Sequence, residues 1–375
     1  MVVPVALVAL VLAMAIGSQL QTYKGNLTGP VQFGREFASF THPPRGALVN
    51  SPNGYDAQFF YLQARDPLLL RDATVRSLRA AGAGFRMQRV AYPALAFLIA
   101  AGQSSAIPFA MLAINALVLM ALAGGFAIYA RRRGWSSFWA FAIALMPGML
   151  LPAVRDLSDP LATASMLAGL LQWQSGRRWP AGAALAVAVL TREVMMLAIV
   201  AVAAEACVRA WRARKAPGEA RKQLLLGWPV VVVPTAAFAV WEAYVMMRYG
   251  GPVGGAGLAF PYVNLIHEIN RDSQGFLPTA VWDLVYLGLI LAAIGAALIS
   301  LRHRVTVTSA AACALALGVL VPTLGDVWSD TRLSAPFLAL VLIDGLQRRS
   351  RSETLIGAAA ASMSIVAPLM IPGLF

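Results

Sequence analysis

Charged residues are scarce in this sequence. Asp, Glu, Lys and Arg together make up 13% of its 375 residues, whereas a soluble globular chain carries roughly 25%. Cysteine is scarcer still, and both Cys207 and Cys313 fall within apolar stretches, so no disulfide framework is expected. These shortages exclude a soluble enzyme, a disordered chain and a disulfide-rich secreted scaffold.

Motifs for metals and nucleotides are also missing from the sequence. The three histidines, His42, His267 and His303, lie at scattered positions that match no His-based metal motif. Neither a P-loop nor the glycine fingerprint of a dinucleotide-binding fold is present. We therefore expect no resident cofactor.

Apolar residues dominate instead, at 59% of the chain with a mean hydropathy of +0.68. About 20 apolar residues suffice to cross a bilayer, and residues 2–20 do so without a charge or a basic leader, which indicates a retained first span. The segment 21–89 is long and polar. Further apolar segments expected to cross are 107–130, 135–153, 160–174, 224–247, 281–301, 305–324, 333–346 and 355–371.

Two segments need a different interpretation. Residues 90–101 are apolar but too short to cross, so we expect a partly embedded helix. Residues 180–208 are flanked by basic runs at both ends, which demands an even number of crossings, and Thr191-Arg192-Glu193 lies in the middle. We predict two short helices that meet at this polar vertex. The whole chain is then one all-α polytopic membrane domain, 1–375, a bundle of about eleven membrane segments with a helical first loop.

The net charge of +13 is distributed unevenly. Of the 30 Lys and Arg residues, 16 lie in short loops between apolar segments, and such loops are typically cytoplasmic. This bias places the N-terminus in the cytoplasm and the loop 21–89 outside it. The excess charge is therefore explained by membrane topology and an anionic lipid partner, and we expect no nucleic acid. The basic runs are 131–133, 177–178, 209–222, 302–304 and 348–351.

The junctions on the other face carry charges of both signs. Ionisable groups at membrane depth are expensive and are functional candidates by default, so we expect one extracytoplasmic site beneath the first loop. A carboxylate can act as a general base, and arginines can hold phosphate oxygens, which together suit a lipid-phosphate substrate. The expected site residues are Tyr55, Asp56, Gln58, Arg89, Arg155, Asp156, Asp159, Arg192, Glu193, His267 and Arg332.

Structural alternatives exist for several of these residues. Asp56 could cap a helix instead of acting as a base. Glu193 could orient Arg192 as a buried ion pair, and Arg155 could pair with Asp156 or Asp159. A lone histidine such as His267 is more often structural than catalytic.

Four segments carry a resemblance to a known family. Residues 54–61 read Gly-Tyr-Asp-Ala-Gln-Phe-Phe-Tyr and are followed by Arg65-Asp66-Pro67, 89–93 read Arg-Val-Ala-Tyr-Pro, 155–160 read Arg-Asp-Leu-Ser-Asp-Pro after Pro147-Gly148, and 190–193 read Leu-Thr-Arg-Glu. In this order they resemble bacterial polytopic glycosyltransferases of the GT-C superfamily, in the mannosyltransferase-like branch.

The resemblance implies an inverting transfer of a sugar from a polyprenyl-phosphate donor to an extracytoplasmic glycan, lipid or protein acceptor at the bacterial inner membrane. It implies that Asp56 is the catalytic base of the first loop. Many relatives carry an Asp-x-Asp in this loop, but here Ala57-Gln58 follow Asp56, which argues against a metal-dependent mechanism. The rival hypothesis is a flippase or transporter of lipid-linked sugars without catalysis. Only 180–208 reads as a broken helix, whereas transporters typically have a matching pair.

Overall fold

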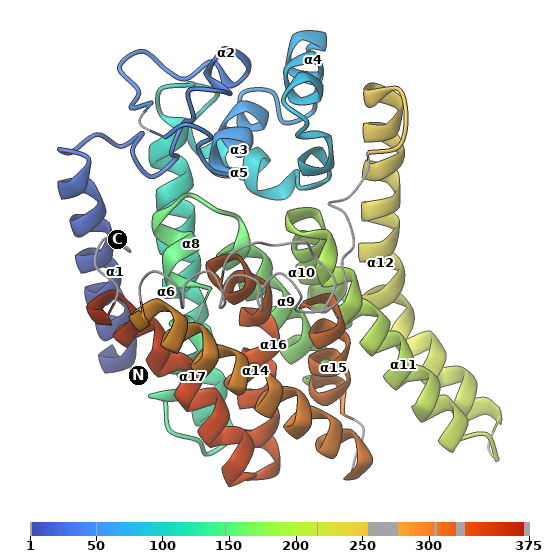
Figure 1. Cartoon of the computed structure of the whole chain (residues 1–375). Coiled ribbons are helices and arrows are strands. Elements are labelled where there is room, and N and C mark those ends of the chain that lie inside the picture. The colour runs from blue at the N-terminus through green and yellow to red at the C-terminus, as the bar shows by residue number, and fades with distance from the viewer. Residues whose placement is uncertain are drawn as a thin grey trace.

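The computed structural model describes residues 2–49, 51–146, 148–215, 217–253, 277–303, 306–319 and 327–370. Throughout these ranges the chain is all-helical, and the only extended pairing among them is an isolated bridge between Gly34 and Ser51 (Figure 1). The all-α class predicted from the sequence is confirmed.

Within the residues that the structure describes, five helical stretches are long and apolar enough to cross a membrane, which indicates a multi-pass membrane protein. They belong to α1, α6, the η2–α11 segment, α12 and α14. The number of eleven segments stays a prediction. The five stretches are Val2–Thr22 (α1), Ile107–Arg132 (α6), Glu193–Arg212, Gly227–Tyr249 within α12 (Pro217–Tyr249), and Leu284–Arg302 within α14 (Leu277–His303).

The remaining helices are shorter or more polar. The first loop and the stretch after it form small helices, and the later ones complete the bundle. In the first part of the chain they are α2 (Ala38–Thr41), α3 (Ala57–Ala64), α4 (Asp72–Ala80), the 3-10 helix η1 (Gly84–Gln88), α5 (Ala91–Ile99), α7 (Trp139–Ala144) and α8 (Leu150–Val154). In the second part they are α9 (Asp159–Gln174), α10 (Arg178–Thr191), η2 (Glu193–Met195), α11 (Met196–Arg212), α15 (Val307–Val319), α16 (Val327–Arg348) and α17 (Arg351–Met370).

The segment 135–153 differs from its prediction as one spanning helix. The chain instead forms two short helices, α7 and α8, with a break between them. Gly148 lies in this break with a φ of +79°, a left-handed conformation that cannot continue a right-handed helix. Both helices still pack into the bundle, since Ala140, Ile143 and Leu150 are buried.

The helix break predicted within 180–208 is present at Arg192. Helix α10 ends at Thr191, Arg192 is extended with φ −157° and ψ 119°, and the chain turns through η2 into α11. Helix α10 packs against α9 and α12, whereas α11 packs against α12 and α15. The extended residue therefore lies where several helices meet, and protein covers its backbone.

The basic turns gather at one end of the bundle, which we call the basic end. The hydroxyl of Tyr129 lies 3.2 Å from Gln174 Oε1, to which Gln347 donates a hydrogen bond of 2.9 Å. Trp173 Nε1 likewise donates to Glu205 at 2.9 Å. These bonds hold together the helix ends that carry 131–133, 177–178, 209–215 and 348–351. The first-loop helices lie at the opposite end (Figure 1).

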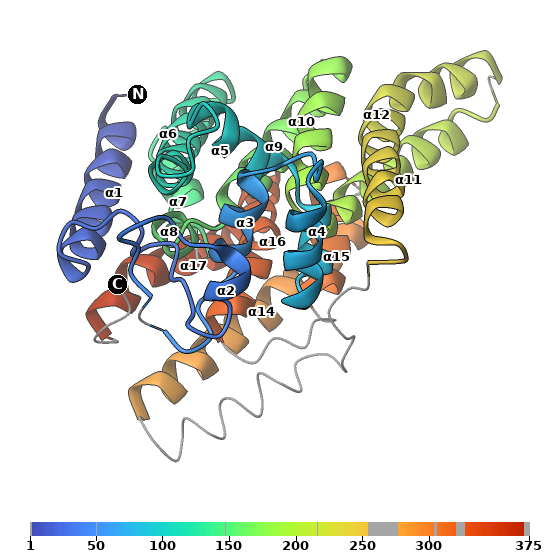
Figure 2. The same cartoon turned by 90° about the horizontal axis from the view of Figure 1, so that it is seen from above.

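Helix α12 anchors the first loop from one side. Trp241 Nε1 donates to the carbonyl of Met87 at 3.0 Å, and Arg248 Nε donates to the carbonyl of Leu69 at 2.8 Å. Arg248 also pairs with Asp72 at 2.7 Å. Seen from above in Figure 2, α2, α3 and α4 lie between α1 and α12. The loop is therefore tied to the bundle through its backbone carbonyls.

Candidate functional site

A close contact of two loop segments positions the start of α3. Gly54 has a φ of +69°, and a Cβ on it would collide with the backbone nitrogen of Gly34. The buried side chain of Gln58 joins the same segments: its Oε1 accepts from Gly34 N at 3.0 Å, and its Nε2 donates to Asn53 O at 2.9 Å. Because backbone groups bond both ends of this amide, Gln58 positions the start of α3, and its contact with a substrate stays a prediction.

Asp56 lies immediately before α3 but does not cap it with its side chain. Its Oδ1 accepts hydrogen bonds from Arg86, one of them from Nε at 3.0 Å, and its Oδ2 lies 3.5 Å from Arg332 Nη2. The side chain keeps 22% of its surface exposed. The alternative of a side-chain helix cap is therefore wrong, and Asp56 is an arginine-held carboxylate with one accessible face.

The charges around Asp56 control its protonation. Burial by itself would raise the pKa of this carboxyl group, but the positive charges of Arg86, Arg332 and Arg89 and the hydrogen bond from Arg86 outweigh burial and lower its pKa below the usual range. Asp56 is therefore ionised at neutral pH. A carboxylate stabilised this strongly is also a weak proton acceptor as long as both arginines hold it.

Arg332, in the first turns of α16, joins three residues. Its Nε donates to Asp159 Oδ2 at 3.1 Å, its Nη1 donates to the Tyr55 hydroxyl at 3.1 Å, and its Nη2 reaches Asp56. The guanidinium carbon also lies 5.5 Å from the centre of the Tyr55 ring. Arg332 is buried, with 6% of its side chain exposed. It therefore links the first loop to the N-terminus of α9.

The break between α10 and α11 directs two charges to different partners. Arg192 pairs with the buried carboxylate of Asp159, whereas Glu193 accepts two hydrogen bonds from Arg89, of 2.9 Å and 2.7 Å. The sequence-based expectation that Glu193 orients Arg192 is wrong. Because the backbone is extended at Arg192, its side chain and that of the next residue point in opposite directions.

Arg155 stacks on an aromatic ring near the cluster. Its guanidinium carbon lies 5.8 Å from the centre of the Tyr55 ring, on which Arg332 also stacks. Asp156 is fully buried, in a left-handed conformation with φ +53°, and neither carboxylate oxygen has a hydrogen-bond partner in the described part of the chain. Tyr55 is therefore the link that brings Arg155 to the cluster, and the described ion pairs do not include Asp156.

Arg86 is the functional residue that the sequence reasoning missed. It holds Asp56 from η1, and its guanidinium carbon lies 4.5 Å from the centre of the Phe59 ring and 4.3 Å from that of Phe85. Its spacing of three residues before Arg89 was the available signal, because residues three apart lie on one face of a 3-10 helix. His267, the remaining predicted residue, lies outside the described residues.

Taken together, five arginines and three carboxylates converge from four regions of the chain. In the described part of the structure, no group of three or more His, Cys, Asp or Glu side chains is arranged to hold a metal ion. Arginines hold all three carboxylates, and guanidinium groups gathered in this way are also suited to an anionic ligand. The cluster, which we call the arginine cluster, consists of Arg86, Arg89, Arg155, Arg192 and Arg332 with Asp56, Asp159 and Glu193.

Comparison of the sequence with protein-family profiles and with curated proteins, and of the structure with solved structures, found no match. Functional inference for this chain therefore depends on the residues and their geometry.

Proposed function

We propose that this chain is an inverting glycosyltransferase that moves a sugar from a polyprenyl-phosphate donor to a hydroxyl acceptor. The observation that carries the proposal is the position of Asp56: a partly exposed carboxylate held between Arg86 and Arg332. A base and a phosphate-binding group are thereby adjacent, as a transfer from a phosphate donor requires.

The arginine cluster supports an anionic, lipid-linked donor. Buried arginines at the end of an apolar bundle are costly unless they are paired, and a phosphate oxygen can accept the same charge-assisted hydrogen bonds as the carboxylates that now hold them. Arg332 and Arg192 are each less than one-tenth exposed, so a phosphate that reached them would be largely desolvated and strongly held. A prenyl chain would remain among the apolar helices while its phosphate contacts this cluster.

Binding of the donor also changes Asp56 in this proposal. When phosphate oxygens accept hydrogen bonds from Arg86 and Arg332, they share the positive charge that now lowers the pKa of Asp56. The carboxylate then becomes a better proton acceptor. In this proposal the pKa of Asp56 rises when the donor binds, so the carboxylate becomes an effective base at the moment when a sugar is present.

The chemical step follows from this arrangement. Asp56 takes the proton of the acceptor hydroxyl, whose oxygen forms a bond to the anomeric carbon from the face opposite the phosphate. The bond between that carbon and the phosphate oxygen breaks, and its electron pair leaves with polyprenyl phosphate. Arginine stabilises the leaving group without protonating it, an electrostatic role of the oxyanion type. Glu193 and Asp159 keep Arg89 and Arg192 in place.

We further propose that the site lies on the extracytoplasmic face of a bacterial inner membrane, with a glycan, lipid or protein as the acceptor. Support comes from the basic turns, which gather at the end opposite the first loop and are typical of cytoplasmic loops.

A second candidate is a flippase or transporter of lipid-linked sugars. It is favoured by the break at Arg192, since discontinuous helices with charges at the break are typical of transporter sites. The two functions differ in one respect that can be measured: a transporter releases its cargo chemically unchanged.

The test is an assay of the purified full-length chain with a panel of polyprenyl-phosphate sugars and candidate acceptors, with and without a chelator. We expect one donor to be consumed, and Asp56→Asn to lower turnover by about 10²- to 10⁴-fold while donor binding persists. Glu36→Gln is the matched control, because Glu36 is an exposed carboxylate of the same loop. Near-normal turnover by Asp56→Asn would overturn its role, and movement of an unchanged donor across vesicles would favour the transporter.

A further inference from the structure

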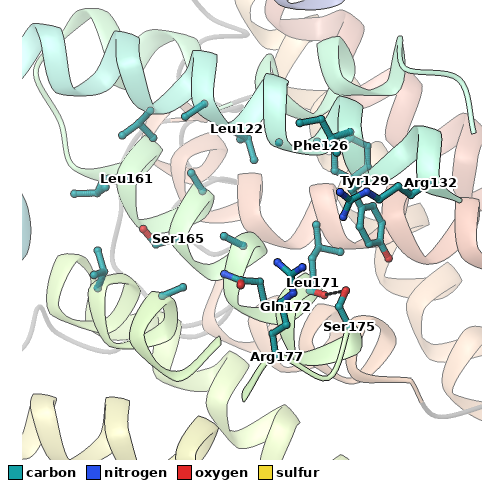
Figure 3. A pocket seen from close by; sticks show the side chains of 18 of the residues that line it. Leu122, Phe126, Tyr129, Arg132, Leu161, Ser165, Leu171, Gln172, Ser175 and Arg177 are labelled. Atoms are coloured by element: carbon teal, nitrogen blue, oxygen red, sulfur yellow. Dashed lines mark hydrogen bonds between the residues drawn. The ribbon is translucent and has the colours of Figure 1, made fainter. Parts of the chain in front are cut away.

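A hollow runs along α9, with one end at Leu161, two residues after Asp159 of the arginine cluster. It has a volume of about 790 Å³ and lies between α6, α9 and α10 (Figure 3). Side chains such as Leu122 and Phe126 of α6, Leu161 and Ala168 of α9, and Val187 of α10 make most of its wall apolar. We call it the α9 groove. Its apolar wall suits a hydrocarbon chain.

One end of the α9 groove is polar and basic. Arg132 and Arg133 at the end of α6 and Arg177 before α10 line it there, and all three are exposed. Two carboxylates described at this end form ion pairs with other arginines, in Arg209–Glu205 and Arg348–Asp344. Within the described residues no carboxylate forms an ion pair with the three arginines of the groove, and Arg133 stacks on the Tyr129 ring. Three cations at one mouth of an apolar groove favour an anionic headgroup.

The length of the groove fits a lipid chain. Its lining along α9 runs from Leu161 to Ser175, about 21 Å at 1.5 Å per residue. The hydrocarbon of one leaflet is about 15 Å thick, half of a bilayer core of about 30 Å. The groove is thus long enough for a whole acyl chain that enters from the basic end. In Figure 3, Leu161 and Ser165 mark the far end, and Arg132 lies at the other.

We propose that the α9 groove is a binding site for one anionic phospholipid of the leaflet at the basic end. The phosphate contacts Arg132, Arg133 and Arg177, and one acyl chain lies along α9 toward Leu161. Basic pockets between membrane helices are suited to anionic headgroups, because the charge and the apolar wall are satisfied by one molecule. The proposal does not depend on glycosyl transfer at the arginine cluster.

The experiment is native mass spectrometry of the full-length chain in detergent, titrated with phosphatidylglycerol or with phosphatidylcholine of the same acyl chains. We expect one phosphatidylglycerol to bind at least tenfold more tightly than phosphatidylcholine. The double variant Arg132→Gln/Arg177→Gln should weaken this binding by roughly 30-fold, or about 2 kcal/mol for two arginines. Arg131→Gln/Arg178→Gln removes the same charge one residue away from the lining, and we expect it to bind like the wild type.

A second pair of variants tests the apolar wall. Ala168→Trp fills the groove and should prevent binding. Leu117 of α6 is 61% exposed and does not line the groove, so Leu117→Trp should leave binding unchanged. Equal binding of the two lipids, or equal losses in the two arginine double variants, would overturn the proposal. A third contrary outcome is that polyprenyl phosphate displaces phosphatidylglycerol and also binds Arg132→Gln/Arg177→Gln as tightly as it binds the wild type. The groove would then hold a prenyl chain that enters from the Leu161 end.

Discussion

Arg89 donates two parallel hydrogen bonds to Glu193, of 2.9 Å and 2.7 Å, across 104 positions of the chain. The pair fastens the end of the first loop to the break between α10 and α11. Paired hydrogen bonds between an arginine and a carboxylate fix orientation as well as distance. The position of the first loop over the bundle therefore depends on a contact that no local sequence signal specifies.

The first prediction concerns this pair. Arg89→Gln and Glu193→Gln should each destabilise the protein, and the double variant should lose less than the sum of the two. We expect a coupling energy between about 0.5 and 3 kcal/mol, in the lower part of that range because Glu193 is 35% exposed and water screens the pair. Unfolding of the detergent-solubilised chain with increasing SDS measures it. Strictly additive losses would mean that the contact contributes no coupling.

The second prediction concerns Arg332. Arg332→Ala should weaken binding of polyprenyl phosphate by about 10- to 100-fold, because hydrogen bonds to a charged group contribute about 1.5 to 3 kcal/mol. Arg332→Lys should restore only part of it, since an ammonium group cannot contact Asp56, Asp159 and Tyr55 with one planar fork. Equilibrium binding of the donor measures both.

Arg35→Ala is the control for Arg332, because Arg35 is an exposed arginine of the first loop. It should bind the donor like the wild type. An equal effect of the two alanine variants would show that net charge alone attracts the donor.

The third prediction is a pH dependence of stability. The folded-state pKa of Asp56 lies below its unfolded value of about 3.9, so its stabilising contribution is complete above that pH and is lost as pH falls through the lowered folded-state pKa. The difference in Tm between the wild type and Asp56→Asn should therefore stay constant from pH 7 to about pH 4.5 and change only under more acidic conditions.

Removing a cation should shift this profile. Arg86→Gln takes away the largest lowering influence on the folded-state pKa of Asp56 and so narrows its difference from the unfolded-state pKa. The acid-induced change in the Tm difference should therefore be smaller in that background and be complete at higher pH, which thermal scans at half-unit pH intervals show. A wild-type difference that already shrinks between pH 6 and pH 5 would contradict the lowered pKa.

The fourth prediction separates the cost of a left-handed backbone at Gly54 from the effect of its close approach to Gly34. Gly54→Ala should lower both Tm and turnover, because the residue has φ +69° and its Cβ would collide with the backbone of Gly34 and Gln32. Gly46→Ala is the matched control: its φ is +81°, but no atom lies within 4 Å of the added Cβ. Both variants bear the cost of a left-handed conformation, about 1 to 2 kcal/mol. Equal losses of Tm and turnover would mean that the close approach does not position Asp56.

Some of this architecture could be predicted from the sequence. The polar vertex at Thr191-Arg192-Glu193 between two basic runs predicted a broken helix, and the break is at Arg192. Charged residues at successive junctions predicted a common site, and the structure brings Asp56, Asp159 and Arg332 into contact. Both inferences follow from the high cost of isolated charge at membrane depth, which is a property of composition and spacing.

The pairing within the cluster could not be predicted in the same way. Which carboxylate meets Arg192 depends on the extended backbone at that residue, and sequence order wrongly favoured its neighbour Glu193. Arg86 was missed because many arginines lie in the first loop, and only the fold selects the one that reaches Asp56. The division of 135–153 into α7 and α8 likewise depends on the backbone conformation at Gly148.

The late position of Arg332 has a consequence for biosynthesis. Arg332 contacts Tyr55 across 277 positions, and domains are generally formed from the N-terminus as the chain is made. Asp56 and Arg86 can meet early in synthesis, and Arg192 can reach Asp159 once α10 and α11 have been made. Arg332, the cation that Asp56 and Asp159 share, follows only with α16. A nascent or truncated chain that lacks α16 therefore lacks the shared cation, and the arginine cluster is complete only after nearly the whole protein has been synthesised.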